Sequence, residues 1–280
     1  MTTKRFNGKA IYQPSGKAAE YSAWACNFFT GCSNDCEYCY CKRGVMSHVW
    51  STKPQLKKCF KSIEHALLVF DGEKAANIGA LRKNGILFSF TTDPMLPETF
   101  EVTLRAAALA VMSGVPVKIL TKRADWLDTS MWASMEPLFL GHKDKIAFGF
   151  TLTGFDDKEP GASTNDERIE AMRELHGLGI KTFASIEPII TPAMSRNMIE
   201  ATRGFCDLYK VGVISGKGKD FYNHKHMTHF WDFLAEQMRA GHKIYIKDSL
   251  LKYFNLKREN LASGWIDSDY NIFNDDNSFK

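Results

Sequence analysis

Short apolar runs alternate along this chain with longer segments of helical spacing. Runs of a few apolar residues bounded by turn residues are typical of buried strands. Six such strands are predicted at residues 24–29, 86–91, 116–121, 146–152, 181–187 and 208–214. Strands that alternate with crossover helices predict a parallel sheet, because parallel neighbours need long connections. The predicted fold class is therefore α/β.

Three connecting segments carry helix signals. Segment 98–113 has apolar residues at the i, i+3, i+4 and i+7 positions of one helix face. Segment 165–178 begins at Asn165, a residue suited to the N-cap, and a third helix fits 227–240. No repeat or low-complexity linker divides the chain, so we predict one domain over residues 1–250. The remaining residues then form a C-terminal extension that packs on this domain or trails from it, over 251–280.

Composition places the protein among ordinary globular chains. It has 280 residues, of which 44% are hydrophobic and 24% are charged, and no stretch reaches the length of a membrane span. Seven cysteines, an odd number, and an N-terminus without a charged and then apolar leader favour reduced thiols and a cytoplasmic location. The net charge of +4 is compatible with a polyanionic partner and does not require one. The first four residues and the polar tail after about residue 268 are expected to fray.

The run GCSNDCEYCY carries the strongest chemical signal. It places Cys32, Cys36 and Cys39 at C-x₃-C-x₂-C spacing. Three thiolates from one loop can hold three irons of a 4Fe–4S cluster, since cysteine is the usual ligand of such iron. No fourth ligand follows at a matching spacing, so one iron stays open. An open metal position marks a reactive site, and here it suits the amino and carboxylate groups of S-adenosyl-L-methionine.

Zinc binding and disulfide formation are the other chemistries that cysteines can supply. A zinc site needs a fourth Cys or His, and Cys26 and Cys41 flank the three, so a zinc knuckle stays open as an alternative. A disulfide framework is disfavoured by the odd number of cysteines. The cysteines outside the motif are expected to be buried or inert thiols, namely Cys26, Cys41, Cys59 and Cys206.

Polar residues end the predicted strands. Parallel α/β folds carry their chemistry at the carboxyl ends of the strands, and the cysteine loop follows the first strand. The other strand ends bring Thr91, Asp93, Lys122, Thr151 and Glu187, and the last strand leads into the lysine-rich run SGKGK. We expect these groups to meet at one rim beside the cysteines.

With its cysteine motif, the Asp-Pro turn at 93–94, the L-T-K strand end at 120–122 and the run EPGASTNDERI, the chain resembles a known superfamily over about residues 26 to 195. It is similar to the radical S-adenosylmethionine enzymes, in their spore photoproduct lyase-like branch. The resemblance implies a partial (β/α)₆ TIM-type barrel of parallel strands with a 4Fe–4S cluster at its open top. It also implies reductive cleavage of S-adenosylmethionine to a 5′-deoxyadenosyl radical that abstracts hydrogen, with a reductase or flavodoxin-type electron donor.

The resemblance also assigns roles by position. Cys32, Cys36 and Cys39 would ligate the cluster, Tyr38 would pack near the adenine, and Tyr40 follows as in the lyases. The residues expected to contact the cofactor are Thr91, Asp93, Lys122, Thr151 and Glu187. Physical chemistry agrees for two of them, because a carboxylate suits a ribose or amino group and a lysine can pair with the cofactor's carboxylate. Glu187 could instead pair with a neighbouring Lys or Arg.

One position departs from the lyases. Three residues before Asp93 the lyases carry a cysteine that returns a hydrogen atom to the product radical. This chain has Phe90 there, which cannot donate a hydrogen atom. Repair of a thymine photodimer by the same relay is therefore in doubt. Cys41 or Cys59 could replace that thiol, although a structural role suits them better.

The substrate leaves fewer signals. The loop SGKGKDFYNHKHMTH places Lys217 and Lys219 beside Phe221 and Tyr222, which suits phosphate contact and base stacking, but also suits a solvated loop. Its three histidines share a helix face poorly, which disfavours a metal site at His224, His226 and His229.

The resemblance to the lyase-like branch, together with the basic loop, favours a nucleic acid or nucleotide as the substrate. The first alternative is a radical enzyme that modifies a peptide or protein, although such enzymes often carry further cysteines near the C-terminus. Here Cys206 is the only cysteine beyond residue 59. The non-enzyme alternative is a zinc-binding nucleic-acid module.

Overall fold

The protein, described from a computed structural model, contains an eight-stranded sheet. The structure describes residues 5–43, 47–48, 50–267 and 270–274. The strands, in spatial order, are β1 (Ile11–Tyr12), β2 (Ala25–Cys26), β5 (Ile86–Phe88), β6 (Val117–Thr121), β7 (Ile146–Thr151), β8 (Lys181–Ile189), β9 (Leu208–Val213) and β10 (Ile244–Ile246). Neighbours from β2 to β10 are parallel, and β1 pairs antiparallel with β2. The predicted α/β class is confirmed.

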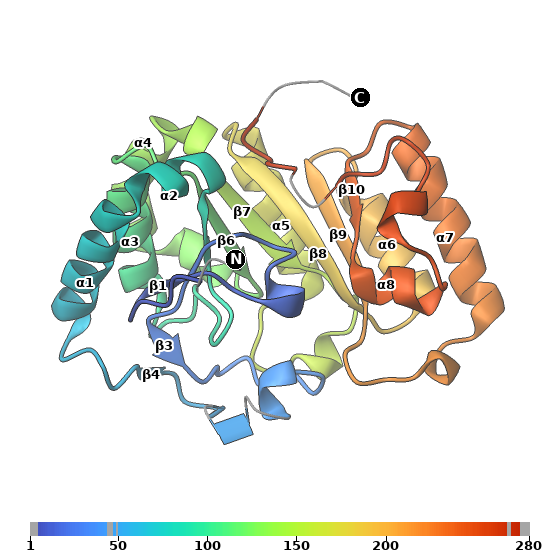
Figure 1. Ribbon diagram of the computed structural model, residues 1–280, viewed down its shortest axis with the longest axis horizontal. Coiled ribbons are helices and arrows are strands. Elements are labelled where there is room, and N and C mark those ends of the chain that lie inside the picture. The colour runs from blue at the N-terminus through green and yellow to red at the C-terminus, as the bar shows by residue number, and fades with distance from the viewer. Residues whose placement is uncertain (1–4, 44–46, 49, 268–269, 275–280) are drawn as a thin grey trace.

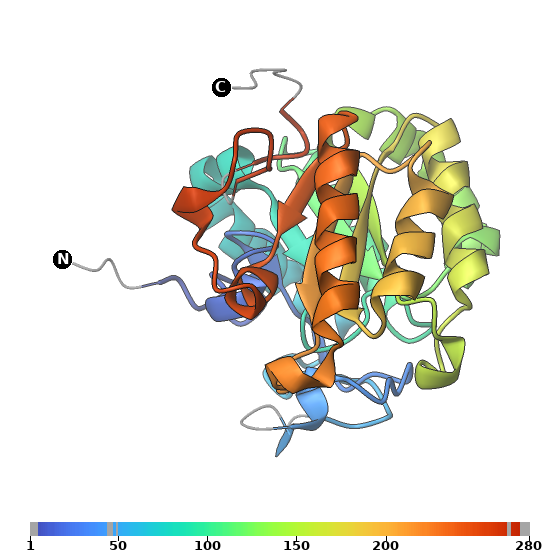
Figure 2. The same ribbon diagram turned by 90° about the vertical axis from the view of Figure 1, so that its right-hand side faces the viewer.

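Helices cover the outer face of this sheet, which curves around an interior (Figures 1 and 2). They are α1 (Ile63–Ala76), α2 (Ile78–Asn84), α3 (Phe100–Val111), α4 (Ser130–Leu140), α5 (Asn165–Gly177), α6 (Pro192–Thr202), α7 (His224–Arg239) and α8 (Asp248–Tyr253). Because β1 and β10 form the two edges, the barrel is open, as expected of a partial TIM-type barrel. In the described residues, no helix has both the length and the apolar character needed to cross a bilayer.

The first predicted strand, 24–29, is split in the structure. Its first half is β2 in the main sheet, whereas its second half, β3 (Phe29–Thr30), pairs with β4 (Gln55–Leu56) in a separate antiparallel ladder. Asn27 lies at the break, where its amide donates to the Tyr12 hydroxyl and its carbonyl accepts from the backbone of Phe90, each at 2.8 Å. The predicted count of six parallel strands was also wrong, because β10 adds a seventh. With three residues it is too short for a periodic signal.

The predicted helices form, with corrected ends. Helix α5 is capped by Thr164, which forms a capping box with Glu167, rather than by Asn165. The Asn165 side chain instead accepts hydrogen bonds from the backbone of Thr153 and Gly154, both at 3.0 Å. Helix α7 begins at His224 and not at residue 227. His224 and His226, which were predicted to lie in the preceding loop, therefore belong to its first turn.

The amino-terminal end of the barrel is closed by apolar side chains. A buried cluster there joins Ala147, Phe183, Leu208 and Tyr245 to Ile272. The expectation that the tail frays was therefore wrong for residues 270–274, while residues 1–4, 268–269 and 275–280 lie outside the described part. The carboxyl ends of the strands point to the opposite end, at the bottom of Figure 1, where the cysteine-containing loop lies.

Candidate functional site

The cysteine loop is held at the carboxyl-terminal rim by backbone hydrogen bonds. The amide of Cys32 donates to Ser51 at 2.7 Å, and the amide of Glu37 donates to Lys158 at 2.9 Å. Within the loop the amide of Cys39 donates to the carbonyl of Cys36 at 3.2 Å. These bonds tie the loop to two segments that are distant in sequence, so its path depends on the assembled fold.

The three thiols have the right chemistry for an iron–sulfur cluster but do not stand in ligand geometry. Among the described residues, no three His, Cys, Asp or Glu side chains are arranged to hold a metal ion. A hydrogen bond with Cys41 is the largest cause that lowers the pKa of Cys39 to about 6, although burial opposes it. Burial raises the pKa of Cys36 and raises that of Cys32 to about 12. Soft thiol donors from one loop fit an iron–sulfur cluster, and they must lose protons to bind it.

Asp93 is the buried group that joins the cysteine loop to the strand ends. Its Oδ2 accepts from the Asn34 side-chain amide at 2.8 Å and from the backbone of Lys122 at 2.7 Å. Its Oδ1 accepts from the Thr121 hydroxyl at 2.6 Å and from the backbone of Met95 at 3.0 Å. A carboxylate offers about four acceptor positions. Asp93 therefore holds the loop in place, rather than presenting a free carboxylate to a cofactor.

A second buried support lies under the loop. Arg168 and Glu159 form an ion pair in which both side chains are 0% exposed, and Arg168 also donates to the carbonyl of Thr151 at 2.6 Å. The Tyr38 hydroxyl donates to the other oxygen of Glu159. Burial and the neighbouring Glu159 raise the pKa of Tyr38 well above its ordinary value, so this phenol stays protonated. Tyr38, which lies between Cys36 and Cys39 in the sequence, is thereby held against Glu159 in the segment that follows β7.

Lys122 is placed beside the thiols. Its ammonium lies 5.5 Å from the centre of the Tyr38 ring. Burial opposes its charge, but the neighbouring Cys36 and Glu159 outweigh that effect and raise the pKa of Lys122. The structure therefore brings a cation, an aromatic ring and the cysteine loop together, as predicted from the strand ends.

Three other predicted residues also lie at this rim. The Thr91 hydroxyl donates to the carbonyl of Phe29 at 2.6 Å, and Thr151 is buried at the end of β7. Tyr40 is 50% exposed, and its hydroxyl donates to the carbonyl of Phe90. The Cys41 sulfur lies 3.8 Å from the same carbonyl oxygen. Their predicted contacts with a cofactor stay predictions.

Glu187 belongs to a different group of side chains inside the barrel. Its Oε2 accepts from the Tyr21 hydroxyl at 2.8 Å and pairs with Lys247 at 2.5 Å. The ion-pair alternative for Glu187 is therefore present in the structure. Tyr21 also shares a hydrogen bond of 2.7 Å with Ser185, and its ring centre lies 6.2 Å from that of Phe90.

The lysine-rich loop after β9 lies at the same rim. Lys219 donates to the side chain of Asn255 at 2.6 Å, and Lys217 lies 5.3 Å from the centre of the exposed Phe221 ring. Tyr222 is buried and donates to the carbonyl of Ile189 at 2.6 Å, so the expectation that it could stack a base was wrong. Phe221 keeps that possibility.

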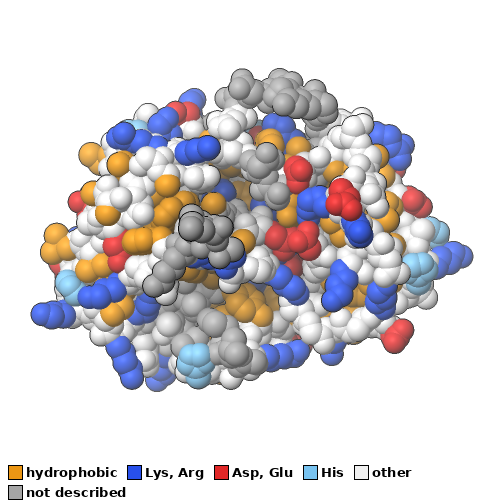
Figure 3. All heavy atoms as spheres, in the orientation of Figure 1, with side chains coloured by type: hydrophobic (Ala, Val, Ile, Leu, Met, Phe, Trp, Pro, Cys, Tyr) orange, Lys and Arg blue, Asp and Glu red, His pale blue; other side chains and the backbone are white. Residues whose placement is uncertain are grey.

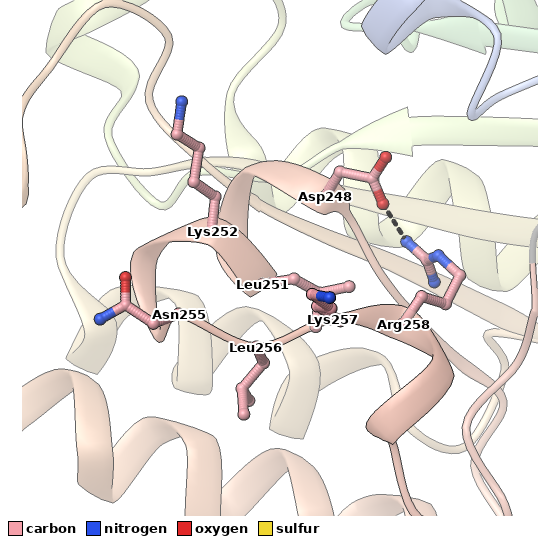
Figure 4. A pocket seen from close by; sticks show the side chains of 7 residues that line it. All are labelled: Asp248, Leu251, Lys252, Asn255, Leu256, Lys257 and Arg258. Atoms are coloured by element: carbon pink, nitrogen blue, oxygen red, sulfur yellow. Dashed lines mark hydrogen bonds and ion pairs between the residues drawn. The ribbon is translucent and has the colours of Figure 1, made fainter.

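A pocket of about 580 Å³ lies beside this loop. It is lined by Asp248, Leu251, Lys252, Asn255, Leu256, Lys257 and Arg258 (Figure 4). Arg258 is turned toward Asp248, with which it pairs at 2.6 Å, whereas Lys252 extends away. On the face drawn in Figure 3, Lys and Arg side chains are scattered over the margins and also lie beside acidic side chains near the centre.

The sequence interpretation missed Asn34, Glu159 and Arg168 as parts of the site. Glu159 and Arg168 lie in the run EPGASTNDERI, which supports the family resemblance but does not indicate an ion pair. A glutamate nine residues before an arginine gives no sign of a buried pair until the turn between them is known. Asn34 gave no such sign either, because its partner Asp93 is 59 residues away in the sequence.

Solved structures share this fold. A single-residue variant of spore photoproduct lyase matches with a TM-score of 0.60 at 15% identity, over 88% of this chain and 81% of that chain. Another lyase variant, with bound AdoMet and dinucleoside spore photoproduct, matches with a TM-score of 0.54 at 16% identity, over 79% of this chain and 64% of that one. SuiB of Streptococcus suis bound to S-adenosylmethionine gives a TM-score of 0.50 at 11% identity, over 84% and 53%. The expected relationship in fold to spore photoproduct lyase is confirmed.

Sequence comparison adds one relative. The uncharacterized protein ORF301 of Acidianus two-tailed virus is 22% identical over 191 residues. This match covers 63% of the chain and 59% of the viral protein, so the chain spans less than two thirds of that relative's length. No protein-family model matches the chain.

Proposed function

We propose that this protein is a radical S-adenosylmethionine enzyme whose cysteine loop binds a 4Fe–4S cluster. The observation that carries the proposal is the loop of Cys32, Cys36 and Cys39 at the carboxyl-terminal rim of a partial barrel with the fold of spore photoproduct lyase. Chemistry in parallel barrels is placed at that rim. When bound, such a cluster supplies the electron that splits S-adenosylmethionine into methionine and a 5′-deoxyadenosyl radical, which abstracts hydrogen from the substrate.

The chain's own residues would hold and orient this chemistry. The three thiolates ligate the cluster, and the Lys122 ammonium, beside Cys36, pairs with the carboxylate of S-adenosylmethionine. Tyr38, fixed by Glu159, packs near the adenine, and Asp93 keeps the loop in register with the strand ends. Thr91, Thr151, Tyr40 and Glu187 complete the surroundings of cofactor and substrate. A reductase or flavodoxin-type protein in the cytoplasm supplies the electron.

A nucleic acid or nucleotide is the proposed substrate. Spore photoproduct lyase, which shares the fold, has been solved with a dinucleoside photoproduct, and this chain places Lys217, Lys219 and the exposed Phe221 at its rim. Such a set of cations and an aromatic ring suits a phosphate backbone and a base. Because Phe90 replaces the thiol of the lyases, the lyase relay itself is not part of the proposal.

The test is anaerobic reconstitution with iron and sulfide, followed by incubation with S-adenosylmethionine and dithionite. We expect a brown protein that forms 5′-deoxyadenosine. Cys36→Ser should lose iron and product, whereas Cys59→Ser, which changes an exposed thiol outside the loop, should keep both. Stoichiometric zinc without iron would instead establish the zinc-binding module. Deuterium transfer into 5′-deoxyadenosine from labelled nucleotides, or from labelled peptides, would then separate the two substrate classes.

A further inference from the structure

The interior of the barrel carries lysines where such barrels usually pack apolar side chains. Lys118 comes from β6, Lys210 from β9, and Lys247 directly follows β10. Side chains alternate along a strand, so Lys210 and Lys247 share the inner face with Leu208 and Tyr245 of the apolar cluster that closes the amino-terminal end. The lysines therefore lie one layer above a closed floor and below the rim that holds the cysteines.

The three ammonium groups converge on two residues of the N-terminal segment. Lys118 donates to the carbonyl of Tyr21 at 2.9 Å, and Lys210 donates to the carbonyl of Glu20. The Lys247 ammonium lies 4.3 Å from the centre of the Tyr21 ring, and that of Lys210 lies 5.2 Å from it. Residues 20–21 thus occupy the space above the lysines.

Among the described residues, Lys247 is the one lysine of the three with carboxylate partners. Lys247 pairs with Glu187 at 2.5 Å and lies 3.7 Å from a carboxylate oxygen of Glu20. Within the described part of the chain, neither Lys118 nor Lys210 lies within ion-pair distance of a carboxylate. Backbone carbonyls and ring faces stabilise these two charges less than an anion would.

The pKa shifts of Lys118 and Lys210 agree with their lack of carboxylate partners among the described residues. Burial lowers the pKa of Lys118 to about 8. Burial, followed by the charges of Lys118 and Lys247, lowers the pKa of Lys210 well below its ordinary value. An anion beside these groups would relieve both effects, because an opposite charge within a few ångströms favours the ammonium form.

Oxygen atoms of the chain itself already stand in for an anion. The carbonyl oxygens of Glu20 and Tyr21 face the two lysines, and Oε2 of Glu20 is buried without a hydrogen-bond donor among the described residues. The same segment reaches the rim, since Lys17 in the short helix η1 (Gly16–Ala18) donates to the Ser215 hydroxyl at 2.9 Å. Residues 20–21 are also held by side-chain contacts that a ligand would have to replace: Tyr21 bonds to Ser185 and Glu187, and Oε1 of Glu20 accepts from the backbone of Asp248 at 2.8 Å and from the Tyr245 hydroxyl at 3.3 Å.

We propose that Lys118 and Lys210, with Lys247 beside them, bind a phosphate monoester group of the substrate inside the barrel, and that this group displaces residues 20–21 from the lysines. A phosphate monoester carries a charge of about −1.5 to −2 at pH 7, which matches two ammonium groups that have no carboxylate partner in the described part of the chain. The site lies near Phe90, whose ring neighbours that of Tyr21. This inference deepens the proposed function by naming a substrate with a terminal phosphate, such as a mononucleotide. It rests on the proposed function only in taking the bound molecule to be the substrate of the radical reaction.

The test is calorimetric titration of the full chain with uridine 5′-monophosphate, uridine and inorganic phosphate at fixed ionic strength. We expect the nucleotide and phosphate to bind and uridine not to bind. Lys118→Met and Lys210→Met should each weaken binding at least about tenfold, equivalent to about 1.4 kcal/mol. Lys83→Met, an exposed lysine of α2, is the matched control and should bind as the wild type does. Backbone amides of residues 18–23 should exchange hydrogen faster when the nucleotide is bound.

Several outcomes would overturn this inference. They are an absence of phosphate and nucleotide binding, unchanged binding by both methionine variants, loss of binding only in a Lys217→Ala, Lys219→Ala double variant, and unchanged exchange at residues 18–23. Because burying a charge without a paired anion costs free energy, replacing either lysine by methionine should leave both variants folded, as thermal unfolding would show. Formation of 5′-deoxyadenosine by the wild type is measured separately, so failure of the radical chemistry and failure of this site are distinguishable.

Discussion

Gly161 lies directly against the backbone of Ser33 in the cysteine loop. A Cβ atom at residue 161 would stand 2.0 Å from the carbonyl oxygen of Ser33, and the amide of Gly161 donates to the carbonyl of Asn34 at 3.1 Å. The two backbones can approach this closely only because residue 161 has no side chain. The position of the cysteine loop at the rim therefore depends on a glycine more than 120 residues away in the sequence.

Gly161→Ala should displace the cysteine loop while leaving the barrel folded. A Cβ contact of 2.0 Å with backbone atoms requires a shift of the loop, because no flexible side chain can yield. We expect reduced iron incorporation on anaerobic reconstitution with an unchanged far-ultraviolet circular dichroism spectrum. The control is Gly204→Ala, where an added Cβ meets nothing within 4 Å. Iron incorporation equal to that of the control would contradict the prediction.

Glu159→Gln should lower the free energy of unfolding by about 3–5 kcal/mol, because it removes the buried partner of Arg168 and leaves only the half-exposed Asp156, at 3.7 Å. Urea denaturation measures this. Glu170→Gln removes a partner from the exposed pair with Arg173 and should cost at most about 1 kcal/mol. Similar losses in the two variants would mean that the buried pair does not support the site.

Asp93→Asn should lower the free energy of unfolding by about 1–3 kcal/mol. Each carboxylate oxygen of Asp93 accepts two hydrogen bonds, so in either orientation the NH₂ group of asparagine would leave two donors without an acceptor. Hydrogen exchange should become faster at the backbone amides of Met95 and Lys122. The control is Asp157→Asn, an exposed carboxylate 3.7 Å from Lys158, which should stay within about 0.5 kcal/mol of the wild type. If exchange at both amides stays slow, the carboxylate is not what fixes the loop.

Because of Lys118, the free energy of unfolding should change with pH in the alkaline range. Burial lowers its pKa to about 8 in the folded protein, whereas the unfolded value is about 10.4. Between these values the unfolded chain binds more protons, so the stability of the wild type relative to Lys118→Met should rise with pH. The groups that face this ammonium are the carbonyl of Tyr21 and the cation of Lys210.

Urea denaturation of both proteins at pH 7, 8, 9 and 10 provides the measurement. The methionine variant should be favoured most at pH 7, where the buried charge is fully present in the wild type, and the difference should shrink toward pH 10. A difference that stays constant over this range would show that Lys118 titrates as it does in the unfolded chain.

The strand and helix periodicities were read correctly where the elements are long. The stripe of Leu104, Ala107, Ala108 and Val111 is buried in α3, and β7 is buried along its whole length. The errors lie in elements of two or three residues. β1 and β10 are too short for a period, and the break at Asn27 depends on partners in other segments, Tyr12 and Phe90.

In the candidate site, too, local features were predicted correctly and contacts between distant segments were not. Cysteine spacing and the polar strand ends placed Tyr38, Lys122 and the cysteine loop at one rim, because parallel strands bring their carboxyl ends together. The roles of Asp93 and Glu187 could not be obtained this way. Whether a carboxylate is free or already bonded depends on which donors the fold brings to it, and both carboxylates have donors from distant segments.

By itself, the amino-acid sequence determined the local properties of this protein: apolar periods that make strands and helices, thiol spacing within a single loop, and the side-chain types at each strand end. These depend on neighbours a few residues apart, which share one stretch of backbone. Only the tertiary structure decided the long-range contacts, among them Gly161 against Ser33, Glu159 with Arg168 beneath Tyr38, and the lysines around residues 20–21. Those contacts arise when the sheet curves and closes its interior, and local spacing does not encode that step.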